Sequence, residues 1–338
     1  MILVTGGLGY IGSHTVVALL QNDYKVVIAD DLSNSSLDVL AGITAITGQR
    51  PAFEQIDLKD AAKVETLFKT YPSINGVLHF AASKAVGESV VNPLKYYRNN
   101  LTVLMNLLEH VNSSLNFVFS SSCTVYGQAD VLPITENTAS QRPESPYGNT
   151  KKVCEELLED FSNTNEFIKT ICLRYFNPIG AHLSNLIGEN PKGVPQNLVP
   201  YITQSAIGRV PQLTVHGTDY PTPDGTCIRD YIHVVDLANA HVAALKYLEN
   251  GQQKKGFDLF NLGTGQGSSV LEVIQSFIRV TGIPLDYTLG PRRAGDIIAA
   301  YASIDKAVKY LNWRPEYSLD EAVLSAWEWE KHHHQQAN

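Results

Sequence analysis

The sequence has few cysteines and no excess of basic residues. Its 338 residues include only four cysteines, at the widely spaced positions Cys123, Cys154, Cys172 and Cys227. Because no two of them form a redox or zinc-ligand pair, we expect reduced thiols packed in the core and no metal site. The net charge of −8 disfavours both a nucleic-acid partner and an anionic membrane partner.

Long apolar segments are also lacking. No run approaches the roughly 18 residues that a membrane-spanning helix requires. The first apolar strand is expected at residues 2–4, so we expect no signal peptide and a cytoplasmic protein. Histidines 332–334 have no second ligand cluster, so we predict that they form a solvated tail and bind no metal.

A glycine-rich turn follows the first expected strand. After the apolar residues 2–4, Gly6, Gly9 and Gly12 have the spacing Gly-x-x-Gly-x-x-Gly. Glycines permit a tight strand-to-helix turn and let a pyrophosphate approach the backbone. A helix expected over residues 10–20 would point its N-terminal amides at that phosphate. The pattern therefore predicts a dinucleotide site.

Two acidic residues end the second expected strand. Residues 25–29 are largely apolar and lead into Asp30 and Asp31, about 20 residues after the glycines. A carboxylate at this position accepts hydrogen bonds from ribose hydroxyls and repels a 2′-phosphate. No Lys or Arg lies between Asp31 and Arg50, so we predict NAD and not NADP.

Tyr147 and Lys151 lie four residues apart, a spacing that places both on one face of a helix. A free phenol has a pKa near 10, and an ammonium group beside it favours the phenolate. Ser122 supplies a hydroxyl that could hold a substrate oxygen. The trio suits removal of a proton from an alcohol while a hydride leaves its carbon. Such pairs alone are common, and the preceding dinucleotide pattern gives this one its significance.

Strands and helices alternate along the first half of the chain. The expected strands include residues 77–82, 116–119, 167–174 and 257–262, and the expected helices include 93–112, 151–163, 197–208, 230–249, 268–281 and 319–331. Alternation of this kind predicts an α/β fold with a doubly wound parallel sheet of the Rossmann type. Because such sheets bind ligands at the carboxyl ends of their strands, we expect Gly6, Asp30, Phe80, Ser122 and Tyr175 to converge.

The composition changes after Phe176, where the chain becomes rich in proline and glycine. We therefore predict two discontinuous domains. Residues 1–176 plus about 231–264 would form an NAD-binding Rossmann domain. Residues from about 177–230 plus 265–338 would form a smaller C-terminal α/β domain that binds the substrate.

The chain resembles the extended short-chain dehydrogenase/reductase family and, within it, the nucleotide-sugar 4-epimerases. The resemblance runs nearly end to end and rests on the segments 5–14, 84–89, 120–127, 147–151, 174–182, 229–234 and 292–296. It implies an isomerase that interconverts UDP-galactose and UDP-glucose through a transient 4-keto sugar and bound NADH. Such an enzyme serves galactose metabolism or supplies UDP-sugars for surface glycans. The resemblance also implies tightly held NAD, regenerated each turnover, and a homodimer, for which helices 93–112 and 151–163 are candidates.

The resemblance implies a role for each matching residue. Tyr147 would take the proton from the sugar 4-hydroxyl, assisted by Lys151 and Ser122. The implied cofactor contacts are Gly6, Gly9, Tyr10, Ile11, Gly12, Asp30, Asp31, Asp57, Leu58, Phe80, Ala81, Lys84, Asn99, Tyr147, Lys151 and Tyr175. The implied contacts to the UDP-sugar are Ser122, Thr124, Tyr147, Asn177, Asn197, Leu198, His216, Arg229, Arg293, Asp296 and Ala300.

Several positions depart from the family pattern. Ala300 stands where strict glucose/galactose epimerases often have a tyrosine, which leaves a larger sugar pocket and predicts activity on UDP-GalNAc and UDP-GlcNAc as well. His216 stands where an aromatic residue often flanks the uracil. Cys123 replaces a common alanine, and we interpret it as a small packed residue. Ala82 and Ser83 replace a Gly-Leu pair and leave the backbone path possible.

Other interpretations stay open at this point. For Arg229 and Arg293, a surface or interdomain ion pair is the alternative to UDP binding. Without the family resemblance, the sequence slightly favours the ion pair. A nucleotide-sugar 4,6-dehydratase would need an acid/base pair beside Ser122, which Cys123 and Thr124 do not provide. An ordinary dehydrogenase would release NADH. A nucleotide-sensing protein without activity would have no need of the tyrosine, lysine and serine together.

Overall fold

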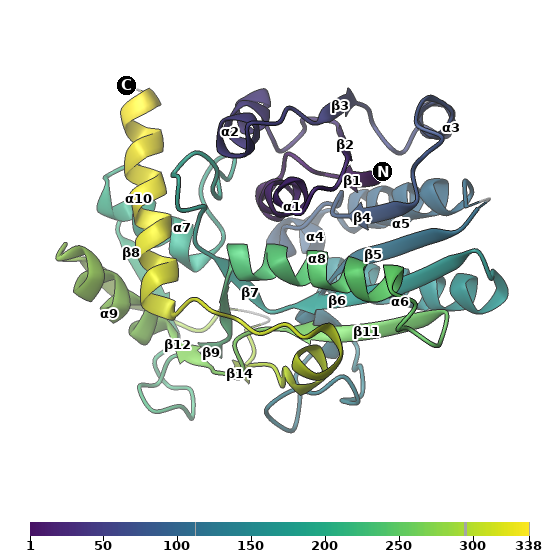
Figure 1. The fold of residues 1–338 in the computed structure, drawn as a ribbon. Coiled ribbons are helices and arrows are strands. Elements are labelled where there is room, and N and C mark those ends of the chain that lie inside the picture. The colour runs from purple at the N-terminus through teal and green to yellow at the C-terminus, as the bar shows by residue number, and fades with distance from the viewer. Residues whose placement is uncertain (112, 294–295, 338) are drawn as a thin grey trace.

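The chain folds around a seven-stranded sheet with the order β11-β6-β5-β4-β1-β2-β3, in which every pair is parallel (Figure 1). The computed structural model describes residues 1–111, 113–293 and 296–337. Gly295, part of the last motif quoted above, lies outside them. The strands are β1 (Ile2–Thr5), β2 (Val26–Asp30), β3 (Ala52–Gln55), β4 (Gly76–His79), β5 (Leu115–Ser122), β6 (Ile168–Tyr175) and β11 (Phe257–Leu262).

Helices cover both faces of this sheet, which confirms the doubly wound α/β fold. One apolar core joins the sheet to α1 (Tyr10–Gln21), α2 (Leu37–Thr47) and α8 (Val234–Glu249). The other joins it to α3 (Ala61–Thr70), α5 (Pro93–Leu108) and α6 (Pro146–Thr164). The central strands β1, β2 and β4 are almost continuously apolar because both of their faces are buried. A short helix, α4 (Val86–Val91), precedes α5.

Several element boundaries differ from the sequence prediction. Helix α6 begins at Pro146 and not at 151, because the Ser145 side chain accepts a hydrogen bond from the Gly148 N–H and Pro146 occupies the first turn. Tyr147 therefore lies in the first turn of α6. Strand β4 ends at His79, so Phe80 and the residues after it form a loop. Helix α5 ends at Leu108, four residues before the predicted end.

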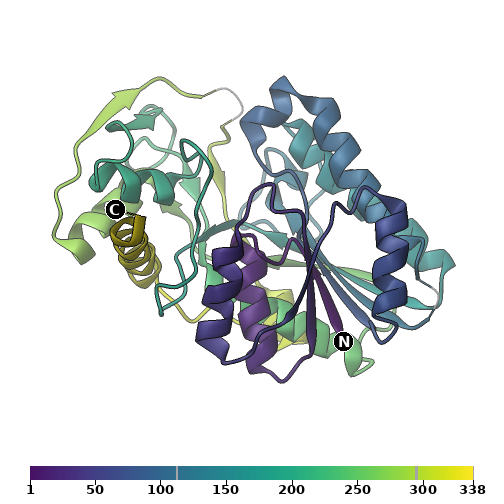
Figure 2. The same ribbon diagram turned by 90° about the horizontal axis from the view of Figure 1, so that it is seen from above.

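A second lobe lies beside the carboxyl end of the sheet (Figure 2). Its small sheets pair β7 (Asn177–Ile179) with β10 (Tyr231–His233), β8 (Leu213–His216) with β13 (Tyr287–Gly290), and β9 (Ile228–Arg229) with β12 (Ser268–Ser269) and β14 (Ala299–Ala300). Its helices are α7 (Leu198–Ala206), α9 (Val270–Thr281) and α10 (Leu319–Ala337). Its core is a separate apolar cluster that includes Ile202, Phe277 and Trp327.

The C-terminal helix extends beyond the predicted range of 319–331. Residues 332–334 continue α10, and the His333 ring stacks on Trp329 with a centroid distance of 4.9 Å. The prediction of a solvated histidine tail is therefore wrong for His333, because the sequence pattern does not reveal that the helix continues. Among the described residues, no helix has the length and apolar character needed to cross a bilayer.

Candidate active site

A single large cleft of about 1830 Å³ joins the carboxyl end of the parallel sheet to the second lobe. Every cofactor and substrate residue predicted from the sequence lines this cleft. Gly6, Asp30, Phe80, Ser122 and Tyr175 converge there because each lies at or directly beyond the carboxyl end of a parallel strand. The expected convergence is therefore confirmed.

The glycine turn leaves no room for side chains. Gly6 has φ +66°, and a Cβ there would lie 2.8 Å from the Ala81 amide nitrogen. A Cβ on Gly12 would lie 2.3 Å from the Gly6 carbonyl oxygen. Backbone amides at the start of α1 thus face the cleft without a covering side chain, which is the cradle that a pyrophosphate requires.

The two acids after β2 differ in their surroundings. The Asp30 carboxylate is buried and accepts hydrogen bonds from the backbone N–H groups of Leu8 and Leu32, both at 3.0 Å. It therefore fixes the glycine turn against the loop after β2. Asp31 is exposed and accepts hydrogen bonds from the N–H and hydroxyl of Ser33. Of the two carboxylates, Asp31 therefore has more free acceptor positions for hydrogen bonds from ribose hydroxyls.

Lys59 connects two of the predicted cofactor residues, Asp57 and Asn99. The Lys59 ammonium lies 3.4 Å from an Asp57 carboxylate oxygen and donates to the Asn99 side-chain oxygen, also at 3.4 Å. Leu58, which lies between Asp57 and Lys59 in the sequence, is buried. Its backbone carbonyl accepts a hydrogen bond from the Asn106 side-chain amide. The cofactor half of the cleft is thus bounded by residues from β1 through α5.

Ser122 ends β5, and its side chain is fixed by two hydrogen bonds from Thr124. Its Oγ accepts hydrogen bonds from the Thr124 N–H at 3.2 Å and from the Thr124 hydroxyl at 3.0 Å. With two bonds accepted, the Ser122 hydroxyl keeps its own proton to donate. Ser122 can therefore donate to an oxygen in the cleft, and Thr124 acts by orienting it.

Tyr147 and Lys151 face the cleft from the first two turns of α6, but their electrostatics differ from the prediction. Burial raises the pKa of Tyr147 to about 12, although its hydrogen bond with Ser122 opposes this. Burial lowers the pKa of Lys151 to about 8. The Lys151 ammonium donates to the Ser120 carbonyl at 2.5 Å and lies 4.7 Å from the centre of the Phe119 ring. The pKa of Tyr147 is therefore raised and not lowered, because desolvation is the largest influence on it.

A buried ion pair lies behind these catalytic candidates. The Arg174 guanidinium donates two hydrogen bonds to the Glu155 carboxylate, at 2.9 and 2.6 Å. The Ser121 hydroxyl donates to the same carboxylate at 2.5 Å. Because Glu155 follows Lys151 by one helical turn, the pair fixes α6 against β5 and β6. We did not predict this ion pair from the sequence. Two features indicated it: Arg174 is a charged residue in the largely apolar segment 167–174, and Glu155 follows Lys151 by four residues.

The opposite side of the cleft carries two arginines around one carboxylate. Arg293 donates to both Asp296 oxygens, at 3.0 and 3.2 Å, and an Arg229 nitrogen lies 3.8 Å from the same carboxylate. Both arginines therefore form ion pairs, as the alternative interpretation expects. Both guanidinium groups also line the cleft, where planar forks can bind phosphate oxygens.

The remaining substrate candidates surround this cluster. Ala300 is buried and pairs with Arg229 in the adjacent strands β14 and β9. His216 ends β8, and its Nδ1 lies 3.3 Å from the Pro291 carbonyl. Asn177 begins β7, and Asn197 and Leu198 mark the start of α7. Burial raises the pKa of the Cys123 thiol to about 12, which agrees with a small packed residue.

A buried histidine supports one cofactor residue. The Tyr175 hydroxyl lies 2.5 Å from His241 Nε2, and His241 Nδ1 lies 2.8 Å from the Leu237 carbonyl. Since Nδ1 must donate to that carbonyl, Nε2 accepts the Tyr175 proton. The His241 ring also lies against Phe80, with a centroid distance of 4.8 Å. Sequence reasoning missed His241 because only the fold brings α8 beneath the cleft.

Comparison with known proteins agrees with this geometry. Residues 2–263 match the model of the NAD dependent epimerase/dehydratase family. A UDP-glucose 4-epimerase of Yersinia pestis is 48% identical over 331 residues, covering 97% of each chain.

Solved structures of similar fold hold nucleotide ligands. The epimerase of Stenotrophomonas maltophila, with bound NAD and formylated UDP-arabinopyranose, is 44% identical with a TM-score of 0.95, covering 99% of both chains. That of Bifidobacterium longum, in complex with NAD+ and UDP, is 44% identical with a TM-score of 0.92, covering 98% of both. A UDP-Glc/GlcNAc 4-epimerase of Campylobacter jejuni is 38% identical with a TM-score of 0.83, covering 98% of this chain and 99% of the other. The chain thus belongs to the NAD dependent epimerase/dehydratase family.

Proposed function

We propose that this protein is an NAD-dependent isomerase that interconverts UDP-galactose and UDP-glucose by inverting carbon 4 of the sugar. The observation that carries the proposal is that one continuous cleft is lined by the glycine turn, by Ser122, Tyr147 and Lys151, and by Arg229 and Arg293. A sugar joined to UDP would therefore present its hydroxyls to the tyrosine while its diphosphate faces the arginines.

Tyr147 is the residue that takes the proton from the 4-hydroxyl and later returns it. Ser122, oriented by Thr124, donates a hydrogen bond to the 4-oxygen. When bound, NAD supplies the acceptor and then the donor of the C4 hydride. The positive charge of NAD would oppose the desolvation that raises the Tyr147 pKa to about 12. The ammonium of Lys151 adds to this effect once a phenolate forms beside it.

The substrate diphosphate competes with the Asp296 carboxylate for hydrogen bonds from Arg229 and Arg293. Arg229 and Arg293 both lie against the Asp296 carboxylate, which holds the two guanidinium groups beside the cleft. Asn177, Asn197, Leu198 and His216 line the same side and would contact the nucleotide. The side chains of Asn177, Asn197 and His216 can exchange hydrogen bonds with the nucleotide, whereas Leu198 offers an apolar contact.

Proton NMR of the purified protein with UDP-galactose, without added NAD, tests the proposal. Appearance of the UDP-glucose anomeric signal until equilibrium would support a 4-epimerase that retains its cofactor. Accumulation of NADH absorbance would instead indicate a dehydrogenase, and formation of a stable 4-keto-6-deoxy sugar would indicate a dehydratase. Either of these two results would contradict the proposed activity.

We also infer that the enzyme converts UDP-GalNAc and UDP-GlcNAc. The small, buried Ala300 adjoins Arg229 and lines the cleft, so no bulky ring from this position fills the space. The similar Campylobacter enzyme named for both UDP-Glc and GlcNAc supports this assignment. Addition of UDP-GalNAc to the same NMR sample provides the test.

Three further inferences concern the whole molecule. We infer a homodimer through α5 and α6, which is supported by the exposed Leu94 and Met105 on α5. Replacing Leu94 with lysine should then shift the sedimentation coefficient toward that of a monomer. We infer a cytoplasmic protein from its four free thiols. We also retain the division into discontinuous domains, 1–176 plus 231–264 and 177–230 plus 265–338, as a proposal that limited proteolysis can test.

A further inference from the structure

The segment that follows β7 crosses from the second lobe toward the adenosine half of the cofactor cleft. Its base is fixed on two sides. Ile187 is buried in the core that contains α1 and α2, and a Cβ on Gly42 of α2 would lie 2.8 Å from the Leu186 carbonyl oxygen. A Cβ on Gly188 would lie 2.4 Å from the Trp329 ring. The chain beyond Gly188 therefore starts from a rigid point between α2 and α10.

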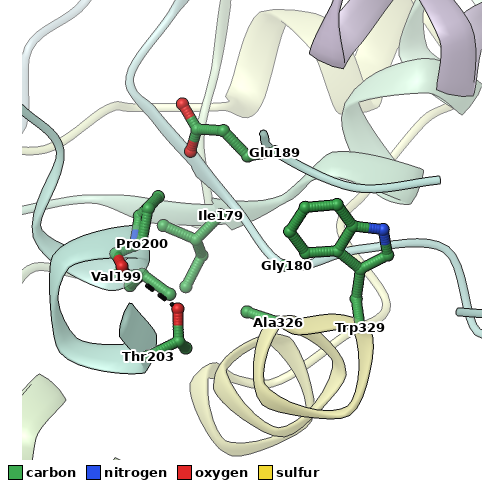
Figure 3. Close-up of a pocket in the computed structure, with 8 residues that line it drawn as sticks. All are labelled: Ile179, Gly180, Glu189, Val199, Pro200, Thr203, Ala326 and Trp329. Atoms are coloured by element: carbon green, nitrogen blue, oxygen red, sulfur yellow. Dashed lines mark hydrogen bonds between the residues drawn. The ribbon is translucent and has the colours of Figure 1, made fainter. Parts of the chain in front are cut away.

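Glu189, the next residue, connects the two halves of the cleft. Its carboxylate points away from Trp329 (Figure 3) and is only 9% exposed. It accepts hydrogen bonds from the Lys84 ammonium at 3.3 Å and from the Asn197 side-chain amide at 2.8 Å. Lys84 follows β4 of the Rossmann sheet, whereas Asn197 precedes α7 of the second lobe. One carboxylate thus holds a predicted cofactor residue and a predicted substrate residue.

Lys192, three residues later, reaches the loop that follows β2. Its ammonium donates hydrogen bonds to the Ser33 carbonyl at 2.7 Å and to the Leu32 carbonyl at 3.2 Å. These two residues directly follow Asp30 and Asp31, the acids predicted to bind the ribose. The sequence between Asp31 and Arg50 contains no cation, but the fold supplies one from 160 residues farther along the chain.

We propose that Glu189 and Lys192 form a clasp that closes the adenosine half of the cleft and sets the rate at which NAD leaves. This inference rests on the NAD site described above. The two contacts, Glu189 with Lys84 and Lys192 with the 32–33 loop, join the segment to loops after β4 and β2, and Ser33, Lys84, Glu189 and Lys192 line one cleft. Because the base at Gly188 is fixed, a bound dinucleotide leaves through this side only when both contacts open.

The contacts of Lys192 and Glu189 also explain how the cleft could retain a ligand. Each hydrogen bond that Lys192 donates contributes little free energy by itself, because the side chain is exposed to water. Residues 189–192 form a short segment that is fixed at Gly188. The chain therefore gains little conformational entropy when a single contact opens, which favours the closed contact. Loss of either contact should therefore shorten the lifetime of bound NAD without changing the glycine turn.

Replacement of Lys192 by methionine tests the clasp. The protein is loaded with NAD and passed through a desalting column, and the NAD that remains bound is measured over time by chromatography of denatured samples. We expect release about tenfold faster than from the wild type, which corresponds to about 1.4 kcal/mol. Lys246→Met is the matched control. Its ammonium donates at 2.7 Å to Asn22, on α1's C-terminal cap, and lies away from the cleft, so release should stay at the wild-type rate.

Glu189→Gln gives a second measurement on the other contact. It removes the charge that holds Lys84 and should also accelerate release, whereas Glu330→Gln, which weakens the pair of the buried Glu330 with the half-exposed Arg209, should not. Thermal unfolding of each ligand-free variant separates a loss of folding from a loss of retention. Equal release from wild type and Lys192→Met would overturn the clasp alone. Failure of the wild type to bind NAD would overturn both the cofactor site and the clasp.

Discussion

The carboxylate of Glu155 and the guanidinium of Arg174 form a bidentate ion pair in which each side chain is only 7% exposed. Each partner adjoins a residue of the active site: Glu155 lies one turn beyond Lys151, and Arg174 precedes Tyr175. Because strand residues alternate between faces, Tyr175 and Arg174 point to opposite sides of β6. The pair therefore holds the helix and the strand that carry the reacting groups at a fixed separation.

Replacement of Glu155 by glutamine should strongly destabilise the protein. The Arg174 charge would remain buried without a counter-charge, which costs about 3–5 kcal/mol of unfolding free energy. Urea unfolding followed by circular dichroism measures this difference. The control is Asp320→Asn, which removes a bidentate but exposed partner of Arg279 and should change stability little. An effect of Glu155→Gln as small as that of the control would show that the buried pair is not a structural anchor.

Stability should fall as the pH decreases below 6.5. Burial lowers the pKa of His14 and His79 to about 3 and that of His233 and His241 to about 4. The unfolded chain binds protons at these residues below pH 6.5 while the folded chain does not, so acid favours unfolding. Each histidine contributes a loss of about 1.4 kcal/mol per pH unit in this range. Asp236, whose pKa is raised to about 6, offsets part of it between pH 6 and 4.

Urea midpoints at pH 7.5, 6.5 and 5.5 check this dependence; the window is about one pH unit on either side of the unfolded histidine pKa. We expect a decline that steepens below 6.5. Replacing the buried His79, which lies 2.6 Å from the Thr5 hydroxyl, by glutamine should make the decline shallower. A midpoint that is constant or rises toward pH 5.5 would contradict the assignment of these histidines as neutral in the folded state.

Introduction of a large ring at Ala300 should narrow the specificity of the enzyme. Ala300→Tyr places the ring at the cleft wall beside Arg229, where the larger N-acetyl substrates would be excluded. We expect kcat/KM for UDP-GalNAc to fall by about 10- to 100-fold, the effect of 1–3 kcal/mol of steric crowding. The rate with UDP-galactose, measured on the same preparation, is the control. Equal losses on both substrates would show that Ala300 does not determine sugar size.

Local sequence patterns were sufficient to predict the cofactor half of the fold. The glycines at 6, 9 and 12, the acids at 30 and 31 and the apolar strands each follow rules that involve only neighbouring residues. The bounds of β11, residues 257–262, were predicted correctly because this short, largely apolar strand is flanked by Gly256 and Gly263. The start of α6 was missed, although Ser145 and Pro146 are typical of a helix N-terminus.

Features that depend on distant contacts could not be predicted. Lys192 reaches Leu32 only because the second lobe folds back over the first, and Glu189 meets Lys84 for the same reason. The pKa of Tyr147 depends on how much water the folded cleft excludes, which no spacing reveals. The sequence pattern placed a lysine near this phenol but contained no information on the desolvation that outweighs it.

Replacement of Tyr147 by phenylalanine tests the central claim most directly. This change removes one hydroxyl and leaves the ring, Lys151 and the glycine turn in place. Conversion of UDP-galactose followed by proton NMR should slow by about 10²- to 10⁴-fold, the usual contribution of a general base. NAD extracted from the denatured variant should match the wild-type amount. Turnover within a few-fold of wild type, with NAD still bound, would contradict the assignment of Tyr147 as the group that moves the 4-hydroxyl proton.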